Sequence, residues 1–252
     1  GGVGASGWAT QTSGIDPNGY LDAGTLSPQG SLTMGGSVGA IIRTMNGGGT
    51  WTPEQTGVEA PFQAIAAVAP NTLYAVANSG AIARTTDGTT WSKLTSPTTN
   101  VLIAVWGSSA SNVYAVGTNG TVLHSTDGTT FTKYVNPASG GIPATATVTD
   151  VAGLDANHVF AAASTGLYES TDGGATWNPV TIAGLMGTDV AAVFAMGADV
   201  WIGAAAGQIY HSTDGVTWTA QPIPGPIGNQ DVTRIRGRAP KVLYVTYSSA
   251  GI

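Results

Sequence analysis

One short phrase occurs five times in this chain and constrains its fold more than any other feature. Each copy runs from a Ser or Thr, through an Asp or Asn followed by Gly, to a Thr that precedes a Trp or Phe. The acidic or amide positions recur every 40 to 45 residues, at Asn46, Asp87, Asp127, Asp172 and Asp214. An interval near 40 residues is typical of repeat proteins, in which each unit packs on its neighbours.

The residue types in the phrase predict a tight corner between two strands. A carboxylate followed by Gly accepts hydrogen bonds from the next backbone N–H groups, while Gly adopts the positive φ that the turn needs. The aromatic residue that closes each copy is expected to pack between sheets, at Trp51, Trp91, Phe131, Trp177 and Trp218. Five similar copies argue for a structural role, because catalysis needs one asymmetric place.

Between the phrases lie short apolar runs of four to six residues, bounded by Gly, Asn, Ser or Pro. Such runs are typical of strands, and no segment shows a sustained 3.6-residue period. Each unit opens with two apolar residues three positions apart: Ile65 and Val68, Leu102 and Val105, Val151 and Leu154, Val190 and Val193, Val232 and Ile235. Four antiparallel strands in about 40 residues predict the blade of a β-propeller, whose sheet faces are buried only against neighbouring blades.

The sequence therefore predicts an all-β chain forming one propeller domain over residues 1–252. We expect six four-stranded blades near residues 21–59, 60–98, 99–147, 148–187, 188–229 and 230–252. The last is completed by residues 1–20, where the segment around Trp8 resembles the fourth strand of other units. A seven-bladed ring or a propeller cropped from a longer chain is the alternative.

Composition excludes several classes of function. Charged residues make up 9% of the chain, and the net charge is −6, so nucleic acid and anionic membrane surfaces are poor partners. There is no Cys to supply a thiolate nucleophile or metal ligand. We expect no cofactor, no metal site and no insertion into a membrane.

The phrase resembles the Asp-box, or BNR, repeat. Residues 105–117 also resemble the YVTN/BNR-like repeats of large secreted bacterial proteins. The resemblance implies a β-propeller at the cell surface or outside the cell, with the periplasm as an alternative. Since Asp-box propellers include sialidases, xyloglucanases, sorting receptors, an assembly factor and lectin-like modules, it implies only a choice of functions.

Residues that break the repeat are the candidates for a site. Trp106 follows the inner strand of its unit, where we expect Ala69, Asp155, Phe194 and Arg236 in the others. Trp106 and Phe194 would then lie near one end of a central channel, either contacting a ligand or plugging the channel.

Two charged groups are further candidates. Asp150, Asp189 and Asp231 precede or begin three successive inner strands, and we expect them at the opposite mouth, as ligand contacts or as local turn caps. Arg234, Arg236 and Arg238 alternate along one strand, where they could bind an anionic sugar or a carboxylate, or simply face solvent.

These observations favour a non-catalytic binding module, with carbohydrate as the expected ligand, because aromatic faces and neutral polar loops suit sugar rings. The alternative is a protein-interaction or structural domain of a larger extracellular assembly. The long connection between Tyr134 and Asp150 would also suit recognition. A glycoside hydrolase is least favoured, since no sialidase-like arginine triad is recognisable.

Overall fold

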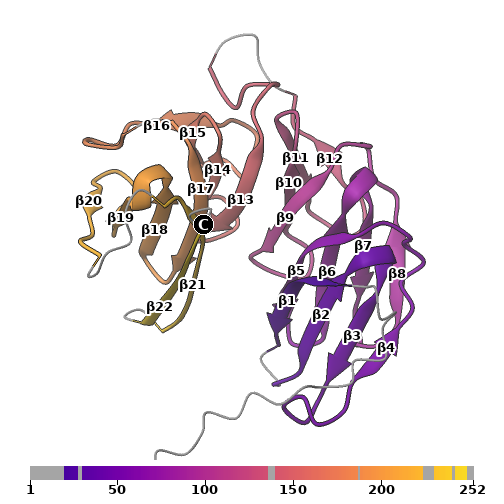
Figure 1. Cartoon of the computed structure of the whole chain (residues 1–252). Coiled ribbons are helices and arrows are strands. Elements are labelled where there is room, and N and C mark those ends of the chain that lie inside the picture. The colour runs from indigo at the N-terminus through magenta and orange to yellow at the C-terminus, as the bar shows by residue number, and fades with distance from the viewer. Residues whose placement is uncertain are drawn as a thin grey trace, which may run out of the picture.

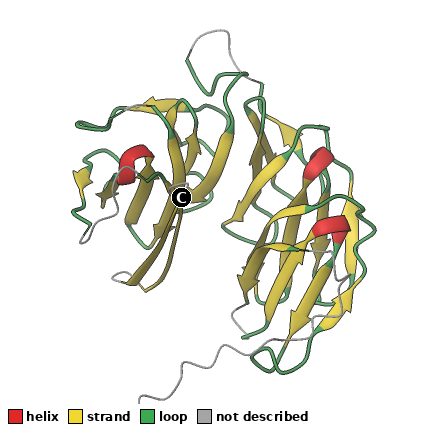
Figure 2. Ribbon diagram, viewed as in Figure 1, coloured by secondary structure: helices red, strands yellow, loops and turns green. Residues whose placement is uncertain are grey.

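The computed structural model describes residues 20–27, 30–135, 140–186, 188–223, 230–239 and 242–248. These residues form five four-stranded antiparallel sheets and one two-stranded sheet, with short 3₁₀ turns and no α-helix among them. Figure 2 shows that strands and loops dominate. The all-β prediction and the four-stranded units are therefore confirmed.

Each sheet is built from consecutive strands, paired in chain order. The first sheet contains β1 (Leu21–Leu26), β2 (Leu32–Gly36), β3 (Ile41–Thr44) and β4 (Thr52–Glu54). The second contains β5 (Phe62–Ala69), β6 (Thr72–Ala77), β7 (Ile82–Thr85) and β8 (Trp91–Leu94). The third contains β9 (Leu102–Gly107), β10 (Val113–Gly117), β11 (Thr121–Ser125) and β12 (Thr132–Lys133).

The remaining sheets follow the same plan. The fourth contains β13 (Val148–Gly153), β14 (Val159–Ala163), β15 (Gly166–Ser170) and β16 (Asn178–Val180). The fifth contains β17 (Val190–Met196), β18 (Asp199–Ala204), β19 (Ile209–Ser212) and β20 (Thr219–Ala220). The sixth contains β21 (Val232–Ala239) and β22 (Val242–Tyr247).

The first strands of successive sheets, from β1 through β5, β9, β13 and β17 to β21, pack beside one another. In Figure 1 these strands lie toward the middle of the molecule and the fourth strands lie outside. This is the arrangement of a β-propeller. The predicted closing segment, residues 1–19 with Trp8, lies outside the described residues, so closure and blade number stay predictions.

The hydrophobic core lies between neighbouring sheets. One buried cluster joins Tyr74, Val76 and Ile82 of the second sheet to Leu102, Val113 and Leu123 of the third. Burial of one such aliphatic or aromatic side chain contributes about 1.5–3 kcal/mol. Neither sheet could bury these residues alone, which explains why the units form a ring-like stack.

The repeated phrase forms the predicted corner. The Asp127 carboxylate accepts hydrogen bonds from the N–H groups of Thr129 and Thr130, both at 2.7 Å, and from the Ser125 hydroxyl at 3.1 Å. The backbone bonds, that from Thr130 first, hold the pKa of Asp127 well below its usual range. The side chains of these acidic residues are exposed, whereas Trp177 at the end of one phrase is buried.

A second repeated turn lies between the second and third strands of the sheets. It forms η1 (Ser37–Gly39), η2 (Asn78–Gly80) and η3 (Ala205–Gly207), and residues 118–120 have the same shape. The middle residue of η2, Ser79, has a φ of 60° and Gly80 has a φ of 71°. A Cβ at Gly80 would lie 2.1 Å from the Thr98 carbonyl oxygen, so Gly is needed where the turn meets the next connection.

Candidate functional site

All six first strands line one cavity at the centre of the sheets. It has a volume of about 430 Å³ and adjoins a smaller space of about 190 Å³, with which it shares Gly24, Ile65, Val105 and Arg236. Together these form the central cavity. Its other lining residues include Trp106, Asp150, Phe194 and Arg234.

Cross-strand pairing shows which residues occupy equivalent places around this cavity. Trp106 lies opposite Tyr114, and Phe194 lies opposite Trp201. The equivalent pairs in the other sheets are Thr25–Thr33, Ala66–Tyr74, Ala152–Phe160 and Arg236–Tyr244. The predicted counterparts Ala69 and Asp155 are therefore wrong by three residues, and Ala66 and Ala152 take their place.

The shift has a simple cause. Strand β5 and the preceding turn carry apolar residues at Phe62, Ile65 and Val68, so moving the pattern by three positions leaves it unchanged. The structure pairs Phe62 with Ala77, whereas Leu102 pairs with Gly117, which makes Phe62 and Leu102 equivalent. Sequence pattern alone could not choose between the two alignments.

Asp150 occupies an interior position of β13 rather than a mouth of the cavity. It pairs with Ala162, and Arg234 of β21 pairs with Thr246 at the equivalent position. Asp189 and Asp231 come before their strands, where the carbonyl of Asp189 accepts a hydrogen bond from Ala205. The predicted grouping of the three carboxylates is wrong, because only Asp150 lines the cavity.

The Asp150 carboxylate is buried and fully engaged. One oxygen, Oδ1, accepts from the N–H of Val151 at 3.1 Å. The other, Oδ2, accepts from the N–H of Val193 at 3.3 Å and from Nη1 of Arg236 at 3.1 Å. The side chain of Asp150 is 7% exposed and that of Arg236 is 50% exposed, so the carboxylate anchors a guanidinium that still faces the cavity.

Asp189 and Asp231 form a separate acidic pair outside the cavity. Burial, and then the charge of Asp231, raises the pKa of Asp189 above its ordinary value. The Asp231 carboxylate accepts from the N–H of Ala206 at 2.9 Å in turn η3. This contact fits the prediction that such residues cap turns locally.

Trp106 and Phe194 both line the cavity and both pack on the next first strand. A Cβ at Gly153 would lie 2.5 Å from Cη2 of Trp106, and a Cβ at Gly237 would lie 2.5 Å from Cε1 of Phe194. Each ring also lies against the aromatic residue of its own second strand, Tyr114 or Trp201. The two rings thus seal neighbouring sheets while presenting part of their surface to the cavity.

The Arg side chains were predicted to share one side of their strand. Arg234 and Arg236 do so, since both line the smaller part of the cavity and are exposed. The side chain of Arg238 lies outside the described residues. Together Arg234 and Arg236 place two positive charges beside one buried carboxylate.

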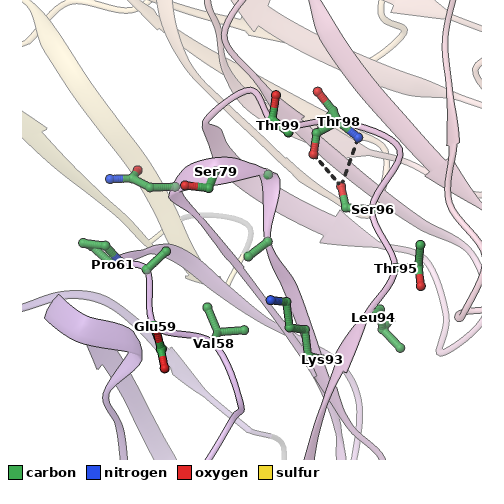
Figure 3. Close-up of a pocket in the computed structure, with 14 residues that line it drawn as sticks. Val58, Glu59, Pro61, Ser79, Lys93, Leu94, Thr95, Ser96, Thr98 and Thr99 are labelled. Atoms are coloured by element: carbon green, nitrogen blue, oxygen red, sulfur yellow. Dashed lines mark hydrogen bonds between the residues drawn. The ribbon is translucent and has the colours of Figure 1, made fainter.

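A second hollow was not expected from the sequence. It lies at the rim of the second sheet, has a volume of about 880 Å³, and is lined by turn η2 and by residues 58–61, 93–96, 98 and 99. We call it the rim groove. Figure 3 shows Lys93, Leu94 and Val58 on one side and Ser79 with the Ser96–Thr98 hydrogen bonds on the other. Its only sequence signal is the shortness of the connections on either side.

Metal and membrane features are limited. In the parts of the chain that the structure describes, no group of three His, Asp or Glu side chains could hold a metal ion. Over the same residues, no helix is long and apolar enough to span a bilayer.

The fold is similar to that of several solved structures. YCF48 bound to D1 peptide is 18% identical, with a TM-score of 0.72 over 97% of this chain and 81% of that one. Virginiamycin B lyase from Staphylococcus aureus with quinupristin is 14% identical, with a TM-score of 0.74 over 94% and 80%. The GH74 xyloglucanase from Xanthomonas campestris is 18% identical, with a TM-score of 0.66 over 91% and 42%.

At such identities the likeness establishes the fold and not the activity. No curated protein sequence gives a significant match to this chain. A family model does match, over residues 31–152 and 157–251, which is most of the chain. The chain therefore belongs to the DUF6242 beta propeller domain family.

Proposed function

We propose that this chain is a non-catalytic binding module whose central cavity takes an acidic carbohydrate. The observation that carries the proposal is the half-exposed guanidinium of Arg236, held in the cavity by Asp150 and accompanied by Arg234. Arginine binds carboxylates through paired, charge-assisted hydrogen bonds. The ligand is therefore expected to carry a carboxylate.

The contacts of Arg236 support this role. Both of its hydrogen bonds within the described residues start at Nη1, one to Asp150 and one to the carbonyl of Ile235 at 2.8 Å. The donors on Nη2 and Nε are then left for a ligand. Because Asp150 is fixed by two backbone N–H groups, it orients the guanidinium before any ligand arrives.

The rest of the cavity suits a sugar. Its volume of about 430 Å³ is within the range of small-molecule sites. Trp106 and Phe194 offer apolar edges, and small residues such as Gly24 and Ala152 leave room between them. A sugar ring would lie against the aromatic edges while its carboxylate reached the arginines.

A peptide carboxylate is the second candidate. It corresponds to the predicted protein-interaction role in a larger extracellular assembly, and it is favoured by the similar fold of YCF48, which was solved with a bound D1 peptide. The same arginines would bind the peptide's terminal carboxylate. The shared chemistry is thus the carboxylate, and the source is decided by experiment.

We propose no catalysis at this cavity. Glycoside hydrolysis generally needs two carboxyl groups flanking the scissile bond. Among the described residues that line the central cavity, Asp150 is the one carboxylate, and its oxygens are engaged by Val151, Val193 and Arg236.

The proposal is tested with a glycan array that pairs uronic and sialic acid glycans with neutral analogues, and with peptides that have free or amidated C-termini. Acidic glycans should bind, and Arg236→Ala should weaken them about tenfold to a hundredfold, as expected for charged hydrogen bonds. Lys133→Ala is the matched control, because it removes one positive charge from the exposed strand β12. Binding only of free-carboxylate peptides would favour the second candidate, and binding unaffected by Arg236→Ala would refute both.

Three finer proposals accompany this function. The five corners are Asp-boxes, as their carboxylate-to-backbone hydrogen bonds support. The protein acts outside the cell or at its surface, or in the periplasm, as the YVTN/BNR-like resemblance implies. Finally, residues 1–20 complete the sixth sheet and close a six-bladed ring, which accounts for the two-stranded form of that sheet among the described residues.

A further inference from the structure

We propose that the rim groove of the second sheet binds an extended peptide segment through one aliphatic side chain, at a site separate from the central cavity. The proposal rests on the repeat itself. The third sheet has, at the corresponding place, a longer connection that folds back and fills the space. The second sheet has no such connection and has the groove.

In the third sheet, Ile142 is the side chain that fills the space. It is fully buried and packs in a cluster with Val122 and Ala146. The segment is also tied to the turn of that sheet, because the N–H of Gly120 donates to the carbonyl of Ala146 at 2.7 Å. A segment of this chain therefore shows what kind of residue fits beside such a turn.

The two places are equivalent by hydrogen bonding. The N–H of Asn78 donates to Pro61, as the N–H of Thr118 donates to Val101, so Gly80 corresponds to Gly120. A Cβ on Gly80 would approach the Thr98 carbonyl, which thus corresponds to the carbonyl of Ala146. Thr98 lines the rim groove.

The fourth sheet gives an independent example of the same filling. Its connection carries Ile182, which is buried, and the side chain of Gln208 ties that connection to the turn through the Gly184 carbonyl at 3.1 Å and the N–H of Met186 at 2.8 Å. Two of the longer connections thus place an isoleucine at the rim. The shorter connections of the first and second sheets leave hollows of about 400 and 880 Å³ instead.

The lining of the rim groove defines the partner. Val58 and Ala81 are buried apolar residues at its base, and Leu94 is partly buried beside them. Ser and Thr hydroxyls from residues 95, 96, 98 and 99 surround this apolar base, and Figure 3 shows Lys93 at the edge. The partner is a peptide with an aliphatic residue in extended backbone and polar neighbours, as in residues 140–147, where Pro143 restricts Ile142 to extended conformations.

The test uses a synthetic peptide with the sequence of residues 140–148 as the probe, titrated into the ¹⁵N-labelled chain and followed by NMR. Peptide addition should shift the amide signals of residues 58–60, 78–81 and 93–99. A peptide with Asp in place of the Ile corresponding to Ile142 should bind at least about tenfold more weakly, because the apolar contact is lost.

Two variants separate the groove from the rest of the surface. Thr95→Trp fills the groove and should weaken the probe at least about tenfold, since it occupies the volume that the aliphatic side chain would take. Ser92→Trp is the matched control on the same sheet, because Ser92 is exposed on β8 and does not line the groove. It should leave binding unchanged.

Arg236→Ala should also leave probe binding unchanged, so that failure of the central-cavity proposal and failure of this one can be told apart. The inference is overturned if the probe shifts no groove signals at millimolar concentration, or if Thr95→Trp and the Asp-containing peptide leave its affinity unchanged. It is likewise overturned if Thr95→Trp abolishes concentration-dependent self-association in sedimentation, because the occupant would then be a second copy of the chain.

Discussion

Tyr74 ties two neighbouring sheets together and offers a sharp test of how the units are joined. Its hydroxyl donates to the carbonyl of Ala110 at 2.8 Å and to that of Gly128 at 2.7 Å, both in the third sheet's loops. The ring is fully buried and meets Phe131 edge to face. Tyr74→Phe keeps these ring contacts and removes only the hydroxyl.

The expected cost follows from what the hydroxyl leaves behind. A hydrogen bond contributes about 0.5–1.5 kcal/mol, and a buried carbonyl without a donor costs about 1–3 kcal/mol. The Gly128 contact is buried, whereas the Ala110 contact is partly exposed and can take a water molecule. We therefore expect a loss of about 2 kcal/mol, which in a chain of this size lowers the Tm by about 4–8 °C.

Thermal unfolding followed by circular dichroism measures this loss. Tyr114→Phe is the matched control, because Tyr114 has the equivalent position but makes one longer bond, 3.3 Å to Ala156; its Tm should fall by about 1–2 °C. Phe160 shows that the same position accepts Phe in the fourth sheet. A Tyr74→Phe chain within 1 °C of wild type, or a larger loss for Tyr114→Phe, would refute the reasoning.

Two further predictions concern pH and closure. Burial, followed by the charge of Asp172, raises the pKa of Tyr114 to about 12, so its contribution is present below the unfolded pKa of about 10 and is lost as pH rises toward 12; urea unfolding between pH 8 and 11.5 should show a steeper loss of stability for wild type than for Tyr114→Phe, and equal slopes would contradict the assignment. If residues 1–20 close the ring, deletion of residues 1–19 removes at least the burial of Trp8, about 2 kcal/mol, and should lower the Tm by about 4–8 °C, whereas an unchanged Tm would show that they do not.

The parts of the fold that sequence could predict are those set by local interactions. The corner at Asp127 depends on bonds to residues two and three positions ahead, so its residue types reveal it directly. The turn between second and third strands likewise depends on Gly80 and its neighbours. Repetition of both signals along the chain then indicates sheets of one kind in one architecture.

The candidate site depends on register, which local pattern does not determine. Val148, Val151 and Leu154 are spaced three apart, so Asp150 could be aligned with residues before the strand or within it. Only pairing with Ala162 shows that it faces the cavity and meets Arg236, 86 residues away. The long connection after Tyr134 was predicted to suit recognition, but its described part places Ile142 in the core.

The cavity owes its chemistry to substitutions at a position that the repeat otherwise fills with Ala. Ala64, Ala104 and Ala192 hold the place that Asp150 and Arg234 take in the fourth and sixth sheets. Arg236 neutralises Asp150, so a bound anion would meet no net attraction from that pair alone. Arg234 supplies the excess positive charge, and recognition of an acidic ligand therefore depends on Arg234 as much as on Arg236. A neutral ligand would require neither, which is why paired acidic and neutral glycans distinguish a charged site from a merely hollow one.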